Sequence, residues 1–141
     1  MIVVDTNILA YLLITGERSA EAERALRKDP VWATPLLWRS ELRNVLALYM
    51  RQRGMTVEQA TQIIDKADEL LQGREYALAS RTVLELVAQS ACSAYGCEFV
   101  ALAQDLDVPL LTDDRRILSE FPKRAISLTR FVSDEAESSE S

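Results

Sequence analysis

The sequence predicts an α/β protein built on a parallel sheet, and two observations carry this prediction. Short apolar runs alternate with segments of helical periodicity along most of the chain. Two apolar runs end in carboxylates: Ile2-Val3-Val4 is followed by Asp5, and Val108–Leu111 leads into Asp113 and Asp114. Strands buried on both faces of a parallel sheet consist largely of Val, Ile and Leu, and ligands gather at the carboxyl ends of such strands. Asp5 and Asp114 are therefore candidate site residues.

The composition is that of a single globular domain whose chemistry rests on carboxylates. The chain has 141 residues, of which 48% are hydrophobic and 27% are charged, and this length fits one core. It contains no histidine, which excludes imidazole zinc sites and the usual catalytic triads. The net charge of −6 argues against non-specific nucleic-acid binding, because phosphate contacts need Lys and Arg. Acid–base or metal chemistry must use Asp and Glu, whose oxygens suit Mg²⁺ or Mn²⁺.

No membrane or export segment is expected. No run approaches the ~20 apolar residues of a spanning helix, and the amino terminus lacks the basic and then apolar order of a signal peptide. Cys92 and Cys97 are too few for a disulfide framework and lack metal-site spacing, so buried thiols are the simpler interpretation. We therefore expect a cytoplasmic protein.

The amino-terminal half predicts strands and helices in alternation. After the first strand, helical spacing covers Ser19–Lys28 and ends before Pro30. Val31–Ala33 is predicted as a short strand, and Pro35 as the first turn of a long helix that ends at Gly54. The apolar face of this long helix has the spacing i, i+4, i+7, i+8 and i+11: Trp38, Leu42, Val45, Leu46 and Tyr49.

The carboxy-terminal half continues this alternation with weaker strands. Thr56 and Gln59 form a capping-box pattern for a helix that runs to about Gln72. The other predicted elements are strands at 76–78, 108–111 and 125–128, and helices at 80–90, with Ser80 as the expected cap, and 95–106. From residue 133 on, the chain contains only Ser, Asp, Glu and one Ala. We expect a domain of residues 1–132 and an acidic disordered tail of residues 133–141.

Three acidic residues are candidates for one site. Asp5 and Asp114 end different strands, and Glu41 lies on or beside the buried face of a helix, where a carboxylate is costly without a partner. The strand ends of a right-handed parallel arrangement share one edge of the sheet, so these carboxylates can converge. Converging like charges raise one another's pKa unless a cation compensates them, which predicts a divalent metal. Helix caps at Asp5 and Asp114, with Glu41 paired to Arg39 or Arg43, would explain each acid separately but explain all three less well.

Four segments carry a resemblance: Val4–Leu9, Trp38–Leu46, Cys97–Ala103 and Pro109–Arg115. In this order and at this spacing they resemble the successive motifs of VapC-type PIN-domain proteins. The resemblance implies a three-layer α/β/α sandwich with a central parallel sheet. It also implies a Mg²⁺- or Mn²⁺-dependent ribonuclease that acts as the toxin of a type II toxin–antitoxin pair, a homodimer, an RNA substrate and a cognate antitoxin that occludes the site.

Motif position gives the roles that the resemblance implies. Asp5, Glu41 and Asp114 correspond to acids that bind metal and catalyse, and Asp113 is a possible additional ligand. The polar residues implied to orient these acids are Thr6, Asn7 and Thr112. Candidate contacts to the RNA phosphates are Arg39, Arg43 and Arg115, although a structural ion pair is the simpler explanation for at least one of these arginines.

The third acid of the family pattern is missing. Where the family has an aspartate that binds metal at the start of a helix, this chain has Gly96, at a position with no evident need for glycine. Glu98 could replace it only through a displaced helix start or a bridging water, because positions i and i+2 do not share a helix face. Otherwise the site works poorly with three acids, or Gly96 is an inactivating change, natural or engineered.

The expected function is therefore a metal-dependent ribonuclease, attenuated by Gly96. The alternative is a catalytically impaired module that dimerises and binds an antitoxin without cleaving RNA. A strand that ends in aspartate also opens the haloacid-dehalogenase phosphatases, but these enzymes need a second aspartate where this chain has Asn7. That third interpretation is the weakest of the three.

Overall fold

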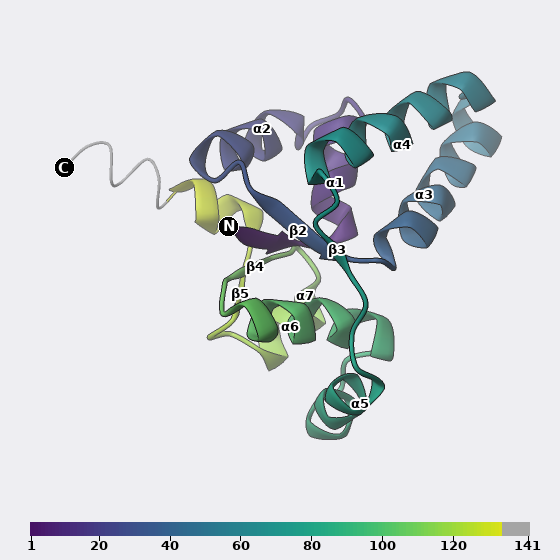
Figure 1. Cartoon of the computed structure of the whole chain (residues 1–141). Coiled ribbons are helices and arrows are strands. Elements are labelled where there is room, and N and C mark those ends of the chain that lie inside the picture. Colours follow the sequence, from purple (N-terminus) through teal and green to yellow (C-terminus); the bar gives the residue numbers. More distant parts are fainter. Residues whose placement is uncertain (134–141) are drawn as a thin grey trace.

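The computed structural model describes residues 1–133, in which five parallel strands form a sheet with helices on both faces (Figure 1). The strands are β1 (Ile2–Val4), β2 (Trp32–Pro35), β3 (Glu75–Tyr76), β4 (Leu110–Leu111) and β5 (Ala125–Ile126). Their order is β3-β2-β1-β4-β5, and each neighbouring pair is parallel. Because β1 is central, the residues that follow β1, β2 and β4 meet at one edge of the sheet.

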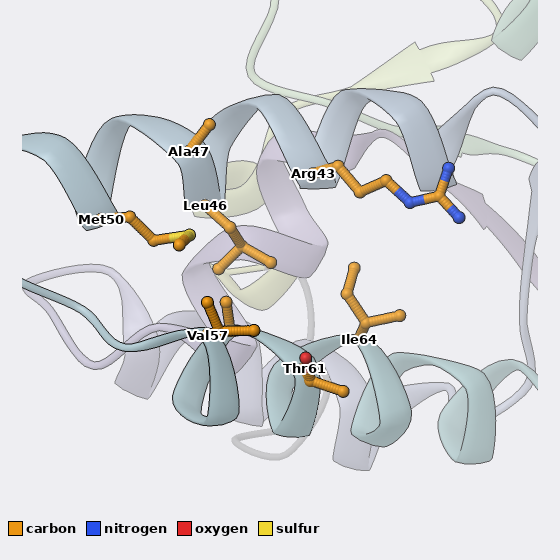
Figure 2. A pocket seen from close by; sticks show the side chains of 8 residues that line it. Arg43, Leu46, Ala47, Met50, Val57, Thr61 and Ile64 are labelled. Atoms are coloured by element: carbon orange, nitrogen blue, oxygen red, sulfur yellow. The ribbon is translucent and has the colours of Figure 1, made fainter.

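The helices divide into two layers. One face carries α1 (Thr6–Leu13), α2 (Ser19–Lys28), α3 (Trp38–Arg53) and α4 (Val57–Leu71), and the other carries α5 (Ser80–Gln89), α6 (Ala94–Leu106) and α7 (Arg115–Glu120) (Figure 1). Residues 128–133 form a further helical segment on the first face. Helices α3 and α4 line an apolar cavity of about 350 Å³ that is open to solvent (Figure 2). The predicted α/β/α sandwich with a central parallel sheet is confirmed.

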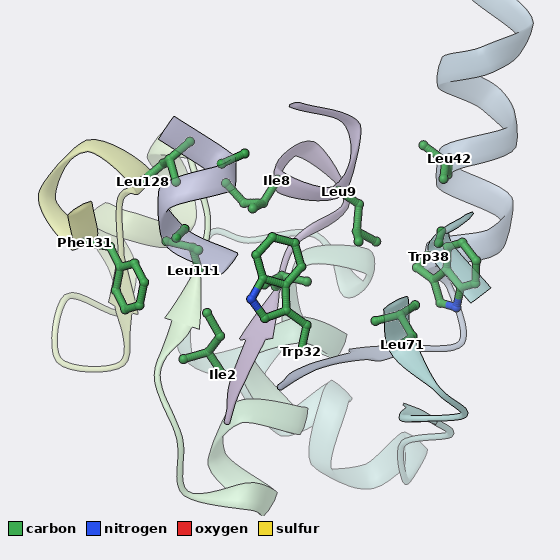
Figure 3. Packing of buried hydrophobic residues seen from close by; sticks show 14 of the residues in the cluster. Ile2, Ile8, Leu9, Trp32, Trp38, Leu42, Leu71, Leu111, Leu128 and Phe131 are labelled. Atoms are coloured by element: carbon green, nitrogen blue, oxygen red, sulfur yellow. The ribbon is translucent and has the colours of Figure 1, made fainter. Parts of the chain in front are cut away.

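The strands have apolar residues on both faces because both faces are buried. Ile2 and Val4 pack under α1–α4, whereas Val3 between them packs against the layer of α5–α7. Figure 3 shows the first of these clusters, with Trp32 of β2 lying among side chains of β1 and α1. The indole N–H of Trp32 donates to the carbonyl of Asp29 at 2.8 Å, so this fully buried ring leaves no unpaired donor.

Two predicted helix starts are wrong. Pro35 is the last residue of β2, in register with Tyr76, and α3 begins only at Trp38. An extended backbone with φ near −65° suits proline as well as a first helical turn does, so the sequence pattern does not separate the two. Ser80 is inside α5, whose capping residue is Ala79 and has no side-chain hydrogen bond.

Other elements follow the prediction closely. α2 has the predicted bounds, and both hydrogen bonds of the capping box between Thr56 and Gln59 are present. α6 begins at Ala94, one residue before the predicted start, with Ser93 as its cap. The last predicted strand is shorter, because a helical segment begins at Leu128.

Within residues 1–133, no single helix is long and apolar enough to cross a membrane. Helices α5 and α6 reach that length and composition only together, and they are bent by 111° at the break between them. The predicted acidic tail lies outside the described residues apart from Ser133, which is helical.

Candidate active site

Asp5 lies at the carboxyl end of the central strand and caps α1. Its Oδ1 accepts the backbone N–H of Thr6 at 2.7 Å, and its Oδ2 accepts the hydroxyl of Thr112 at 2.6 Å. Asp5 is only 9% exposed. The two interpretations that the sequence left open, a helix cap and a site residue, are therefore compatible in one side chain.

Thr6 connects Asp5 to Glu41. Its backbone N–H donates to Asp5, and its hydroxyl donates to Oε1 of Glu41 at 2.8 Å. Glu41 lies in the first turn of α3, the helix that follows β2, and is half-buried. Burial raises the pKa of Glu41 against the lowering effect of the Thr6 hydrogen bond, and the charge of Glu98 raises it further.

Thr112 connects Asp5 to Asp114 on the other side. The Thr112 hydroxyl donates to Asp5 and accepts the backbone N–H of Asp114 at 3.0 Å. Asp114 caps α7, because its Oδ1 accepts the N–H of Ile117 at 3.0 Å. Thr112 is fully buried, so its side chain is fixed between the two acids. The structure thus brings Asp5, Glu41 and Asp114 together through two threonines.

The electrostatics of this edge are unfavourable to negative charge. Burial raises the pKa of Asp5 to about 6, the hydrogen bonds from Thr112 and Thr6 oppose this, and Glu41 and Asp114 add repulsion. Burial also raises the pKa of Glu98. In the part of the chain that the structure describes, no lysine or arginine forms an ion pair with Asp5, Glu41 or Asp114. The site therefore has carboxylates without a compensating cation.

The donor set suits a hard divalent ion, although the carboxylates are not gathered tightly. Among residues 1–133, no three acidic side chains lie close enough to hold one ion between them directly. Thr6 instead links Asp5 to the carboxylate of Glu41, and Thr112 links the carboxylate of Asp5 to the backbone N–H of Asp114. All available donors are oxygens, which favours Mg²⁺ or Mn²⁺, and a cation beside Asp5 would relieve the repulsion described above.

Gly96 borders this edge without a conformational need for glycine. It is the third residue of α6, and the glycines with positive φ are Gly54 and Gly73. Gly96 and Asp114 both line a cavity of about 210 Å³. A Cβ at position 96 would lie 3.3 Å from Cδ1 of Ile117 and so requires only a small shift of that side chain. A longer side chain at position 96 would start beside the cavity that Asp114 lines.

Glu98 does not act on Asp5, unlike Glu41 and Asp114. It lines a separate cavity of about 300 Å³ between α5 and α6. Its charge acts on Glu41, whereas the charges that raise the pKa of Asp5 are those of Glu41 and Asp114. α6 begins at Ala94, so Glu98 leaves the helix on a different face from position 96 and could reach an ion there only through a bridging water.

Asp113 and Arg39 form ion pairs within the fold, although they were predicted as a metal ligand and a phosphate contact. Asp113 pairs with Arg18 at 2.8 Å and accepts the backbone N–H of Leu128 at 3.1 Å. The guanidinium of Arg39 pairs with Asp68 and, at 3.0 Å, with Glu75. The structure therefore does not group Asp113 with the other acids, and Arg39 is already occupied and is not a free contact for phosphate.

The remaining predicted residues lie at three different places. Arg115 is exposed and directly follows Asp114 at the start of α7. Arg43 is exposed on α3 at the end of the apolar α3–α4 cavity (Figure 2). Asn7 lines a cavity between α1 and α3 and makes no hydrogen bond to the acids; among the described residues its buried Oδ1 has no partner. The sequence places Val45 and Tyr49 of that cavity on the apolar face of α3 and gives no signal for its other residues.

Comparison with known proteins gives a consistent result. Residues 2–124 match the sequence model of a family described as PIN domain. Ribonuclease VapC3 of Pyrobaculum aerophilum is 29% identical over 124 residues, which cover 86% of this chain and 95% of the relative. The crystal structure of PAE2754 from Pyrobaculum aerophilum superposes with a TM-score of 0.65 at 21% identity and covers 96% of both chains. At that identity, the structural likeness supports the fold alone.

Proposed function

Because the chain belongs to the PIN-domain family and is of its VapC type, we propose that it is a metal-dependent ribonuclease and the toxin of a type II toxin–antitoxin pair. The observation that carries this proposal is the cluster around Asp5. Three carboxylates lie at one edge of the sheet, the pKa of the central one is raised to about 6, and no cation within residues 1–133 compensates them. Acids with strongly shifted pKa values at the carboxyl ends of parallel strands are typical of catalytic sites.

Each acid has a role in this proposal. Asp5 would hold Mg²⁺ or Mn²⁺, with Glu41 and Asp114 binding directly or through water. When bound, such an ion lowers the pKa of a water molecule and stabilises negative charge on the phosphoryl oxygens. Thr6 and Thr112 keep the carboxylate oxygens in fixed orientations by the hydrogen bonds described above. The burial of Asp5 strengthens its interaction with any cation, because less water screens it.

The partners follow from the same family membership. We propose that the chain acts in the cytoplasm on RNA, that a cognate antitoxin inhibits it, and that it forms a homodimer. Arg115, exposed and adjacent to Asp114, is the best placed of the predicted phosphate contacts, and Arg43 is a second candidate.

A specific observation favours a second candidate function. Position 96 supplies no side chain, and the described acids do not form a group that could hold an ion directly between three of them. A chain that folds normally but binds metal weakly would still bind its antitoxin. This alternative is a catalytically impaired PIN module that captures the antitoxin without cleaving RNA.

The experiment that tests the proposal changes Gly96 alone. We expect Gly96→Asp to bind Mn²⁺ more tightly and to cleave single-stranded RNA at least about tenfold faster than the unchanged chain. Gly96→Asn is the matched control, because it adds nearly the same volume at the same backbone position without the charge. Calorimetric titration with Mn²⁺ and electrophoresis of end-labelled RNA measure the two effects.

The outcomes separate the two candidate functions. Cleavage that depends on Mn²⁺ and is fastest in Gly96→Asp supports a nuclease attenuated at position 96. Antitoxin binding with no cleavage by the unchanged chain, but cleavage by Gly96→Asp, supports the impaired module. No cleavage by any of the three chains would refute the ribonuclease proposal.

A further inference from the structure

A cavity of about 420 Å³ lies between α1, α2 and α3, outside the cluster of acids. Its lining includes Asn7 and Tyr11 of α1, Arg18 just before α2, and Val45 and Tyr49 of α3. We infer that this cavity receives a nucleobase of the RNA substrate, next to the phosphate that is cleaved, and that Asn7 contributes to the choice of base. This inference rests on the proposed ribonuclease function and extends it to substrate selection.

The position of the cavity supports this assignment. Asn7 lies in the first turn of α1, two residues after its cap Asp5. Val45 follows Glu41 by four residues on α3, a rise of about 6 Å or slightly more than one helical turn. The cavity therefore begins within one turn of two of the acids. Burial, the charge of Asp113 and a hydrogen bond with Asp113 raise the pKa of Tyr11, and the charge of Asp5 adds a smaller effect, so this ring lies beside Asp113 and within reach of the field of Asp5. A phosphate held at Asp5 would place the adjoining nucleoside at the mouth of this cavity.

The walls of the cavity are suited to a flat ring. The guanidinium of Arg18 lies over the ring of Tyr11, 5.0 Å from its centroid. Asp113 and Glu21 hold that guanidinium in place, each at 2.8 Å, so its charge is compensated and its planar face is fixed. Single-stranded RNA is commonly recognised by stacking of its bases on aromatic rings and arginine planes. Tyr49 provides a second aromatic ring from α3.

Asn7 provides the hydrogen-bonding group that such a site needs. Its Oδ1 is buried and has no hydrogen-bond partner among the described residues, so a rotation of the amide toward the cavity that Asn7 lines would break no hydrogen bond of that oxygen. An unpaired buried acceptor costs free energy, and the amino group of a nucleobase would satisfy it once the amide turns toward the cavity. The amide of asparagine can also present a donor and an acceptor together to one base edge. The cavity volume lies in the usual range of about 300–1,000 Å³ for small-molecule sites.

The test fills the cavity and measures RNA binding. Ala10 lines the cavity, and Ala10→Leu would occupy part of it. Ala47→Leu is the matched control, because Ala47 is also a half-buried helical residue but lines the α3–α4 cavity (Figure 2). All chains carry Asp5→Asn, which prevents cleavage during the measurement. The probes are fluorescein-labelled strands of twelve nucleotides, with only A, only C, only U, or no base, and fluorescence anisotropy gives their affinities.

We expect at least one homopolymer to bind about tenfold more tightly than the strand without bases. Ala10→Leu should reduce this difference to less than twofold, Ala47→Leu should preserve it, and Asn7→Ala should change the preference among bases. If Ala10→Leu does not fold, as judged by circular dichroism, Tyr49→Leu replaces it, because this change removes the ring and keeps an apolar side chain.

Three results would overturn the inference. They are equal affinity for strands with and without bases, a base preference that survives Ala10→Leu or its substitute, and a cavity that binds N-acetyl-tryptophanamide while showing no base preference. The last result would assign the cavity to a protein side chain. Because the readout is binding, base preference without cleavage by Gly96→Asp would refute only the nuclease proposal, whereas cleavage with base-independent binding would refute only this inference.

Discussion

Carboxylates at two places along this sheet have opposite environments. At β3, Glu75 accepts hydrogen bonds from Arg39 and from the indole of Trp38, and Arg39 lowers its pKa. At the end of β1, burial raises the pKa of Asp5 to about 6, and none of the groups that act on it is a cation. The first arrangement stabilises the fold, whereas the second opposes it. A buried carboxylate without a cation lowers the free energy of unfolding. We therefore assign function to the edge at Asp5 and not to that at Glu75.

The largest effect should come from removing the charge of Asp5. Asp5→Asn keeps the helix cap, since asparagine also accepts a backbone N–H, but it removes the central ligand. We expect Mn²⁺ affinity and RNA cleavage, both measured in the Gly96→Asp chain, to fall at least about 100-fold. Glu75→Gln is the control from the other region and should leave both values unchanged. A loss of metal affinity in Glu75→Gln as large as in Asp5→Asn would remove the distinction between the two regions.

The same substitution should stabilise the metal-free protein at high pH. Folding raises the pKa of Asp5 from 3.8 to about 6. The folded state therefore has its full free energy of unfolding below pH 4, where Asp5 is protonated, and loses part of it as the pH rises through 6. The difference corresponds to roughly 3 kcal/mol at most. In EDTA, Asp5→Asn should therefore match the unchanged chain near pH 4 and exceed it by up to about 3 kcal/mol at pH 8.

Urea denaturation at a series of pH values measures this difference. Mn²⁺ should stabilise the unchanged chain at pH 8 and should not stabilise Asp5→Asn, because only a charged Asp5 binds the ion. A stability difference that stays constant from pH 4 to pH 8 would show that Asp5 does not carry the electrostatic cost that we assign to it.

Removal of Arg39 should have the opposite sign. Arg39→Met leaves the carboxylates of Asp68 and Glu75 without their cation, and the guanidinium is 31% exposed, between the surface and buried cases. We expect a loss of about 2 kcal/mol in the free energy of unfolding. Arg81→Met is the matched control, because the pair of Arg81 with Glu85 is largely exposed. That change should cost less than about 0.5 kcal/mol. Equal losses in both variants would show that the Arg39 cluster is no stronger than a surface pair.

The sequence predicted the general fold and the central acids because their signals are local. An apolar run that ends at Asp5 and a helix with Glu41 near its buried face follow from periodicity alone. The structure adds which side chains lie between the acids. Motif position implies that Thr112 orients the acids, but only the structure shows how: its hydroxyl donates to Asp5 and accepts the backbone N–H of Asp114, so the contact joins β1 to the loop after β4.

The arginines show what the sequence leaves open: it predicts a structural ion pair for at least one of Arg39, Arg43 and Arg115, but not which one. Arg39 and Arg43 are four residues apart on one helix and had the same predicted role. Arg39 meets Asp68 and Glu75, which come from a different helix and an edge strand, whereas Arg43 forms no ion pair within residues 1–133. The two arginines differ because Arg39 has tertiary partners about 30 residues away along the chain. Helix spacing carries no information on such partners.

The smallest predicted effect comes from Gly96→Ala, which tests whether packing requires glycine at this position beside the acids. Alanine in a helix is more stable than glycine by up to about 1 kcal/mol. The added Cβ would lie 3.3 Å from Cδ1 of Ile117, so this side chain, which lines the 210 Å³ cavity, must shift by a few tenths of an ångström. We therefore expect Gly96→Ala to increase the free energy of unfolding by about 0.5 kcal/mol in urea denaturation. If it decreases instead, and Ile117→Val restores the gain in a double-mutant cycle, packing against Ile117 explains the glycine. A gain in the single variant would leave no structural reason for glycine at this position, and the missing carboxylate would then be a change to the site and not a requirement of the fold.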